Sequence, residues 1–102
     1  MSKNTYTKRN ISEKVADRIN LDKKLAHEMV SEVFTVMREM LSGDSKNIRI
    51  EIRNFGTFTI KPTKAKPRAR NPRTNEEIYV PPHRKSHFKP GRLLKEELRK
   101  PI

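Results

Sequence analysis

The chain has 102 residues, which suits one small domain. Its 24 lysine and arginine residues outnumber 12 acidic ones, which gives a net charge of +12, and only 32% of the residues are hydrophobic. This balance favours a polyanionic partner, most often nucleic acid. No apolar run approaches the ~18 residues of a membrane span, and the first ten residues lack the apolar segment of a signal peptide. Without cysteine, disulfides, thiolate catalysis and cysteine-bound zinc are excluded.

A first amphipathic helix is expected after a basic tail over residues 1–6. Thr7 is a candidate N-cap for a helix over residues 8–19, and Asn20 can end that helix in a left-handed conformation. Apolar residues recur at every fourth position of this segment, which predicts a single apolar stripe. These residues are Ile11, Val15 and Ile19.

A second and more apolar helix is expected over residues 23–41, with Asp22 as its N-cap and Gly43 just beyond its end. Its apolar stripe is too wide for one short neighbouring helix to cover. With so few apolar residues in the whole chain, we expect either a small fold with basic extensions or a core shared by two chains. The stripe consists of Leu25, Ala26, Met29, Val30, Val33, Phe34, Val36, Met37, Met40 and Leu41.

The hydrophobic period then changes from that of a helix to that of a strand. Isoleucine at every second position predicts a half-buried strand over residues 48–53, and a second strand is expected over 57–60. Between them a tight turn is expected at Asn54, Phe55 and Gly56, in which Gly56 is free to take a positive φ.

A basic and proline-rich segment follows, over residues 61–92. It carries ten basic and two acidic residues, a net +8 of the chain's +12, and six of the seven prolines. Prolines exclude a helix there, and turn-forming residues at 71–75 predict the tip of a long hairpin that returns over 76–80. The basic residues are Lys61, Lys64, Lys66, Arg68, Arg70, Arg73, Arg84, Lys85, Lys89 and Arg92.

A short amphipathic helix over residues 92–99 is expected to close the chain, after Pro90 and Gly91. We expect three of its leucines to point inward, Leu93, Leu94 and Leu98.

Two interpretations of the basic hairpin compete. The first is a solvated charged surface, but a two-stranded ribbon with no apolar face is marginal in water and has no folding reason to exist alone. The second is an arm that follows phosphates and inserts arginines into a groove, so that affinity falls steeply with salt. Pro72 at the tip is either an ordinary turn proline or a wedge that unstacks a base step and kinks the duplex.

The sequence contains no motif that strongly indicates a catalytic site or a metal site. His83 and His87 are four residues apart, which suits a metal only on one helical turn, and the neighbouring prolines disfavour a helix there. Glu76 and Glu77 have no third catalytic group near them, and we expect them to reduce repulsion within the arm. The three glycines form no phosphate-binding loop. We therefore expect no enzyme activity, no metal and no cofactor.

Three motifs, in this order and spacing, resemble the bacterial HU / integration host factor family of histone-like DNA-bending proteins. They are Phe55-Gly56-Thr57-Phe58, Arg70-Asn71-Pro72-Arg73-Thr74 and Phe88-Lys89-Pro90-Gly91-Arg92-Leu93-Leu94-Lys95. The resemblance covers about residues 7–100.

The resemblance implies an intertwined dimer in which the second helices of two chains pack together, three-stranded sheets cover them, and two arms reach round one duplex. It implies that Pro72 intercalates from the minor groove and that Arg70, Asn71, Arg73 and Thr74 contact that groove. Further DNA contacts are expected from the basic arm, from the residue before the Asn-Phe-Gly turn and from two helix starts. These are Lys64, Lys66, Arg68, Arg84 and Lys85, then Arg53, then Lys8, Gly91 and Arg92.

The sequence departs from the family pattern at three places. Asn75 and Asn54 stand where glycine is common, and asparagine tolerates a positive φ. The outgoing strand of the arm is one residue longer than usual, which would turn its side chains to the other face unless a bulge absorbs the extra residue. We predict that bulge between Lys61 and Arg68.

The expected fold is α+β: two N-terminal helices, an antiparallel three-stranded sheet with a long two-stranded β-arm, and a short C-terminal helix, in an intertwined dimer. The expected divisions are a tail at 1–6, a dimerisation body at 7–60, a DNA-binding arm at 61–82, and a return strand and helix at 83–102.

The expected function is to bind and bend double-stranded DNA, with a preference for bent or flexible DNA. The partner chain is a second copy or a paralogue, no membrane is involved, and the location is the cytoplasm, at the nucleoid. The alternative is a small basic RNA-binding or ribosomal structural protein. Single-stranded RNA readers expose stacking aromatics, and here only Tyr6 and Tyr79 are candidates outside the expected core and the Phe88 junction.

Overall fold

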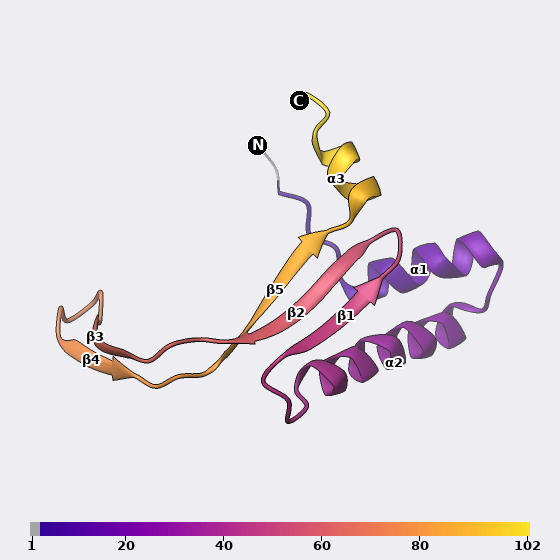
Figure 1. The fold of residues 1–102 in the computed structure, drawn as a ribbon. Coiled ribbons are helices and arrows are strands. Elements are labelled where there is room, and N and C mark those ends of the chain that lie inside the picture. Colours follow the sequence, from indigo (N-terminus) through magenta and orange to yellow (C-terminus); the bar gives the residue numbers. More distant parts are fainter. Residues whose placement is uncertain (1–2) are drawn as a thin grey trace. The chain divides into compact units, whose positions relative to one another are not determined.

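The computed structural model describes residues 3–102, apart from the side chains of Lys66 and Pro67. The described residues form two compact units, which divide between Ser42 and Gly43 (Figure 1). The first unit holds two helices, and the second holds five strands and a helix, so the fold is α+β as predicted. In chain order the elements are α1 (Lys8–Ile19), α2 (Lys23–Leu41), β1 (Ile48–Ile52), β2 (Gly56–Pro62), β3 (Lys66–Arg70), β4 (Glu77–Val80), β5 (Arg84–Pro90) and α3 (Arg92–Leu98).

The first unit is a pair of packed helices whose ends are set by local capping. Thr7 and Asn10 form a capping box in which each side chain accepts from the other residue's backbone N–H. Asn20 ends α1 in the left-handed conformation at φ 51°, and the carboxylate of Asp22 accepts from the N–H of Leu25 at the start of α2. The predicted bounds and caps of both helices are therefore confirmed.

The packing of α1 on α2 buries small side chains and leaves the large apolar ones of α2 outside. Ser12 and Ala16 of α1 and Ala26 of α2 are buried. Most of the wide stripe of α2 is exposed, as its width predicts, because α1 covers only one side of it. The exposed members are Leu25, Met29, Val33, Phe34, Val36 and Met40.

The second unit is built on an antiparallel three-stranded sheet with the order β1-β2-β5 (Figure 1). The register pairs Ile50 with Phe58 and Phe58 with Phe88, so apolar residues lie side by side on one face. Phe55 joins them, and the rings of Phe58 and Phe88 are 4.8 Å apart between centroids. Ile60 on the central strand is buried.

The turn between β1 and β2 differs from the prediction. Asn54, rather than Gly56, has the positive φ, at 66°. Asparagine tolerates this conformation, so the turn needs no glycine there. Gly56 is the first residue of β2, and its role is steric: a Cβ on it would lie 2.6 Å from the carbonyl oxygen of Lys89 and 2.6 Å from the Phe88 ring.

The helix α3 also differs from the prediction, because only one of its three leucines is turned away from solvent. Leu94 is half-buried, whereas Leu93 is 48% and Leu98 is 68% exposed. The helix has seven residues and packs against β5, which covers one narrow side of it. The described part of the chain contains no helix long and apolar enough to cross a bilayer.

We predict that Gly56→Ala lowers the free energy of unfolding by about 1–3 kcal/mol, since the new methyl group must displace the β5 backbone or the Phe88 ring. Urea denaturation measures this change. Gly43→Ala is the matched control, because no atom lies within 4 Å of a Cβ at that position outside its own neighbours and its φ is not positive. Equal stability of the two variants would contradict the steric role of Gly56.

Candidate nucleic-acid interface

The basic segment forms one hairpin that continues the central sheet. Strands β2 and β5 pair as far as Pro62 and Arg84, and β3 and β4 resume at Lys66 and Val80 without a change of register. Figure 1 shows the β3–β4 ribbon running beyond the three-stranded sheet. We call residues 61–82 the arm.

The extra residue in the outgoing strand is absorbed by a bulge, as predicted. Lys66 pairs with Val80 and Ala69 pairs with Ile78, so two residues of β3 face one residue of β4. The irregularity lies between Lys66 and Ala69, at the distal end of the predicted interval. Arg68 is the exposed described side chain of the bulge, and that of Lys66 lies outside the described part of the structure.

The tip of the arm is held by a network of local hydrogen bonds. Asn75 has φ 60°, and its N–H donates to the carbonyl of Asn71 at 2.7 Å. The side chain of Asn71 accepts from the N–H of Arg73 at 3.0 Å. Pro72, Arg73 and Thr74 are exposed in the turn that these bonds define. The structure therefore presents the proline ring and its basic neighbour to solvent.

Arg70 is tied across the hairpin rather than extended away from it. Its guanidinium donates to the carbonyl and side-chain oxygens of Asn75, each at 3.4 Å, and lies 3.8 Å from the carboxylate of Glu77. The expectation that the two glutamates reduce repulsion within the arm is confirmed for Glu77. Because the pair is more than half exposed, its attraction is modest and weakened further by salt.

The arm also has a short apolar stripe that the sequence analysis missed. Ala69 is paired with Ile78, and Val80 lies two residues further on β4, so the three side chains share one face of the ribbon. Ala69 and Val80 are half-buried and Ile78 is 42% exposed. The alternation of Ile78 and Val80 is a sequence signal for this face.

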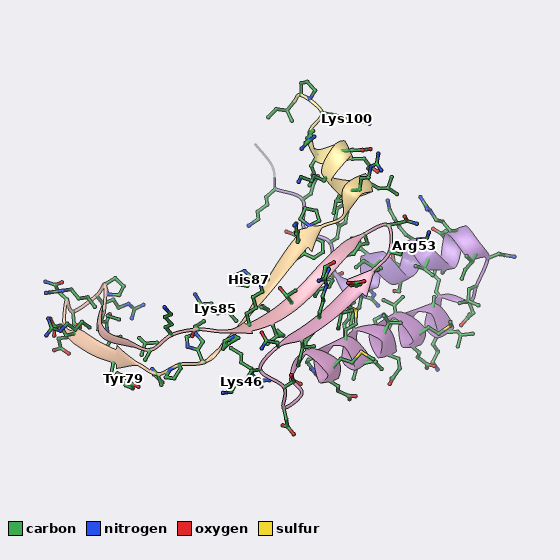
Figure 2. The ribbon with its side chains drawn as sticks, in the orientation of Figure 1. Lys46, Arg53, Tyr79, Lys85, His87 and Lys100 are labelled. Atoms are coloured by element: carbon green, nitrogen blue, oxygen red, sulfur yellow. The ribbon has the colours of Figure 1, made fainter. Side chains whose placement is uncertain are left out.

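Like charges meet where the arm leaves the sheet. Lys61 and Lys85 are directly opposite each other in the register, an arrangement that is unfavourable without an anion nearby. Lys61 was not among the predicted contacts, although the charge run includes it. Arg84 is anchored by donating from Nη1 to the carbonyl oxygens of Gly43 and Ser45, while Lys64 is exposed. Figure 2 shows Lys85 and His87 on β5 and Tyr79 further along the arm.

A third group of candidate residues gathers where the turn between β1 and β2 meets the start of α3. The N–H of Gly91 donates to the carbonyl of Phe55 at 2.8 Å, which ties the helix start to the turn that carries Arg53. Arg53 and Gly91 line one open depression. Gly91 has no side-chain cap, and the adjacent Arg92 pairs with Glu96 at 3.2 Å.

Lys8 is the one predicted contact residue that belongs to the first unit. It is exposed at the start of α1. The capping box there uses the N–H of Asn10, so that amide is already satisfied, whereas Lys8 adds a positive charge beside the helix end.

The candidate residues of the second unit thus form three groups, at the arm tip, at the arm base and at the start of α3. The arm tip comprises residues 70–74, the arm base comprises Lys64, Lys66, Arg68, Arg84 and Lys85, and the third group comprises Arg53, Gly91 and Arg92. Each presents cations or an uncapped helix start, which are groups that bind anions. Among the described residues, no group of three histidine or acidic side chains could hold a metal ion.

Comparison with known proteins finds DNA-binding proteins that are similar to this chain over nearly its whole length. A family model described as "Bacterial DNA-binding protein" matches residues 6–99. The integration host factor subunit alpha of Glaesserella parasuis is 35% identical over 92 residues, which cover 90% of each chain. That of Legionella pneumophila strain Corby is 35% identical over 97 residues, which cover 95% of this chain and 96% of the relative. A cocrystal structure of Anabaena HU with DNA matches with a TM-score of 0.80 and 27% identity, over 94% of this chain and all of that one.

We predict that Asn75→Ala loosens the arm tip, because alanine at φ 60° costs roughly 1–2 kcal/mol. Hydrogen exchange of the residue-75 amide, which bonds to Asn71, should quicken about tenfold. Asn75→Gly is the control, since glycine adopts the same φ without strain, and it should keep the tip turn closed. Equal exchange in the alanine variant and in the wild type would show that the left-handed residue does not define the turn.

Proposed function

The chain belongs to the family of bacterial DNA-binding proteins, and we propose that it is an architectural protein that binds double-stranded DNA and bends it through the minor groove. The observation that carries this proposal is the arm. It is a ribbon that runs beyond its own sheet, lies in a segment with most of the chain's excess positive charge, and ends in an exposed proline.

We assign the arm to the minor groove because its tip exposes a proline beside an arginine, and minor-groove binders use such an apolar wedge with neighbouring cations. Arg70, Asn71, Arg73 and Thr74 would contact the groove, and Pro72 would enter between two base pairs and unstack them. The apolar stripe of the arm would replace water along the groove. Because the minor groove mainly distinguishes A·T from G·C, sequence preference should be modest.

Bending is a balance between deformation and phosphate contacts. Bending a short site costs about 1–6 kcal/mol, and unstacking adds a few kcal/mol per step. The cost is offset when bent DNA reaches cations that straight DNA does not touch. We propose that the flanking contacts come from the arm base (Lys64, Lys66, Arg68, Arg84, Lys85), from the β1–β2 turn and α3 (Arg53, Gly91, Arg92), and from Lys8.

We further propose that the active form is an intertwined dimer, either of two copies or of one copy and a paralogue. The exposed stripe of α2 and the exposed leucines of α3 need a partner surface. The relatives are named as subunits, which agrees with a paired chain. In this proposal residues 7–60 form the dimerisation body, residues 61–82 the DNA-binding arm, residues 83–102 the return strand and last helix, and residues 1–6 a basic tail. The place of action would be the nucleoid.

A competition experiment tests the function. Pre-kinked duplex, straight duplex and RNA compete for the purified protein at two salt concentrations. The proposal expects the kinked duplex to bind tightest and all duplex binding to weaken steeply with salt. Preferential binding of RNA would support a ribosomal or other RNA-binding role instead.

We predict that Pro72→Ala reduces DNA bending more than it reduces affinity, because the wedge is lost while the charges remain. Energy transfer between dyes at the two duplex ends measures the bend, and titration measures the affinity. Pro101→Ala, the same change beyond α3 and outside the arm, should bend DNA like the wild type. Unchanged bending by Pro72→Ala would show that the proline is no wedge.

We predict that Arg73→Ala weakens binding and lowers the slope of log affinity against log salt by roughly one unit, because one phosphate contact is lost. Arg38→Ala in α2 removes the same charge outside all three groups of candidate residues and should leave the slope unchanged. An identical slope for Arg73→Ala and the wild type would mean that this arginine meets no phosphate.

A further inference from the structure

We propose that Thr63 and His83 form a bracket that fixes the direction in which the arm leaves the sheet, and so act as positioning residues for DNA binding. This inference rests on the function proposed above. Both residues lie in the junction, which we define as residues 63–65 and 81–83, between the pairing of β2 with β5 and that of β3 with β4.

The junction is the weakest part of the hairpin by composition. Pro62 precedes it, and Pro81 and Pro82 lie within it, so these positions have no N–H to donate across the strands. Within the described residues of the junction, all cross-strand hydrogen bonds belong to Thr63 and His83.

Thr63 repairs the ladder with its side chain. Its N–H donates to the carbonyl of His83 at 2.7 Å, as in a regular antiparallel pair. The return bond of such a pair would reach the Thr63 carbonyl. Instead, the N–H of His83 donates to Thr63 Oγ1 at 3.2 Å, and this hydroxyl donates to the His83 carbonyl at 3.1 Å. The hydroxyl therefore takes the place of a backbone acceptor.

The histidine ring closes the bracket. Its Nδ1 lies 3.3 Å from Thr63 Oγ1 and 3.1 Å from the carbonyl oxygen of Pro81. With the proton on Nδ1, the ring donates to these oxygens and holds both strands of the junction. Thr63 is half-buried, whereas His83 is exposed.

The bracket matters because the arm must be aimed before it binds. Lys61 and Lys85 are opposite each other in the register two residues before it, and like charges placed in this way disfavour the pairing of the two strands. If the junction opened, the arm would sample many directions, and DNA binding would have to order it. The loss would reduce affinity without removing any phosphate contact.

The test compares the full-length protein with Thr63→Val, which keeps the branched shape and removes the hydroxyl, and with Thr63→Ser, which keeps the hydroxyl. The matched control is Thr59→Val, because Thr59 also faces a histidine, His87, on β2 and β5, and its side chain makes no hydrogen bond in the described part of the structure. Hydrogen exchange of the His83 amide is measured without DNA, and affinity for a straight duplex is measured at several salt concentrations.

We expect Thr63→Val to quicken exchange of the His83 amide about fivefold and to weaken duplex binding about fivefold at an unchanged salt slope. Thr63→Ser and Thr59→Val should stay close to the wild type. The proposal is overturned if Thr63→Val keeps the wild-type exchange rate of the His83 amide or the wild-type affinity for duplex DNA. It is also overturned if Thr63→Ser loses as much affinity as Thr63→Val, or if Thr59→Val does. If the wild type binds no duplex, the proposed function fails, while the exchange rates still decide whether the bracket exists.

Discussion

The scarcity of apolar burial within one chain is the constraint on which this structure depends. The buried apolar side chains in the described residues are Ala16, Ala26 and Ile60, and two of them are alanines. At about 25 cal/mol per Å², so little area stabilises a fold only weakly. The large residues that could supply the missing area line α2 and α3 and face solvent. A second chain that covers these faces would complete the core, and each core would then carry two arms.

The arm depends on the three-stranded sheet for its stability. A two-stranded ribbon is marginal in water by itself, and this one carries facing lysines at its base. It inherits its register from β2 and β5, crosses a proline-rich junction through Thr63 and His83, and ends in a turn tied by Asn71 and Asn75. The prolines and cations of the arm lower its stability, and in the proposed function the cations contact phosphates and Pro72 enters the groove. The residues that make the arm unstable by itself are therefore the residues that we propose bind DNA.

Local chemistry made much of the fold predictable from sequence. The caps at Thr7, Asn20 and Asp22 depend on neighbours within four residues. The spacing of hydrophobic residues that indicates a helix or a strand is likewise visible within a few positions of the sequence. The bulge was predicted from the family resemblance, because the outgoing strand is one residue longer than the family pattern. The differences concern positions that depend on partners distant in sequence: Gly56 is needed for its close approach to β5 while Asn54 takes the positive φ, and Leu93 and Leu98 of α3 are exposed in the described part of the chain. The bracket joins residues 20 apart, so only the register reveals it.

The concentration dependence of thermal unfolding tests the shared core most directly. Mass action makes an obligate dimer more stable as its concentration rises. The account predicts that the midpoint of unfolding increases steadily across a wide range of protein concentration, with a sedimenting species of twice the 12.0 kDa chain mass below the transition. A midpoint that stays constant, together with a folded species of one chain mass, would contradict it.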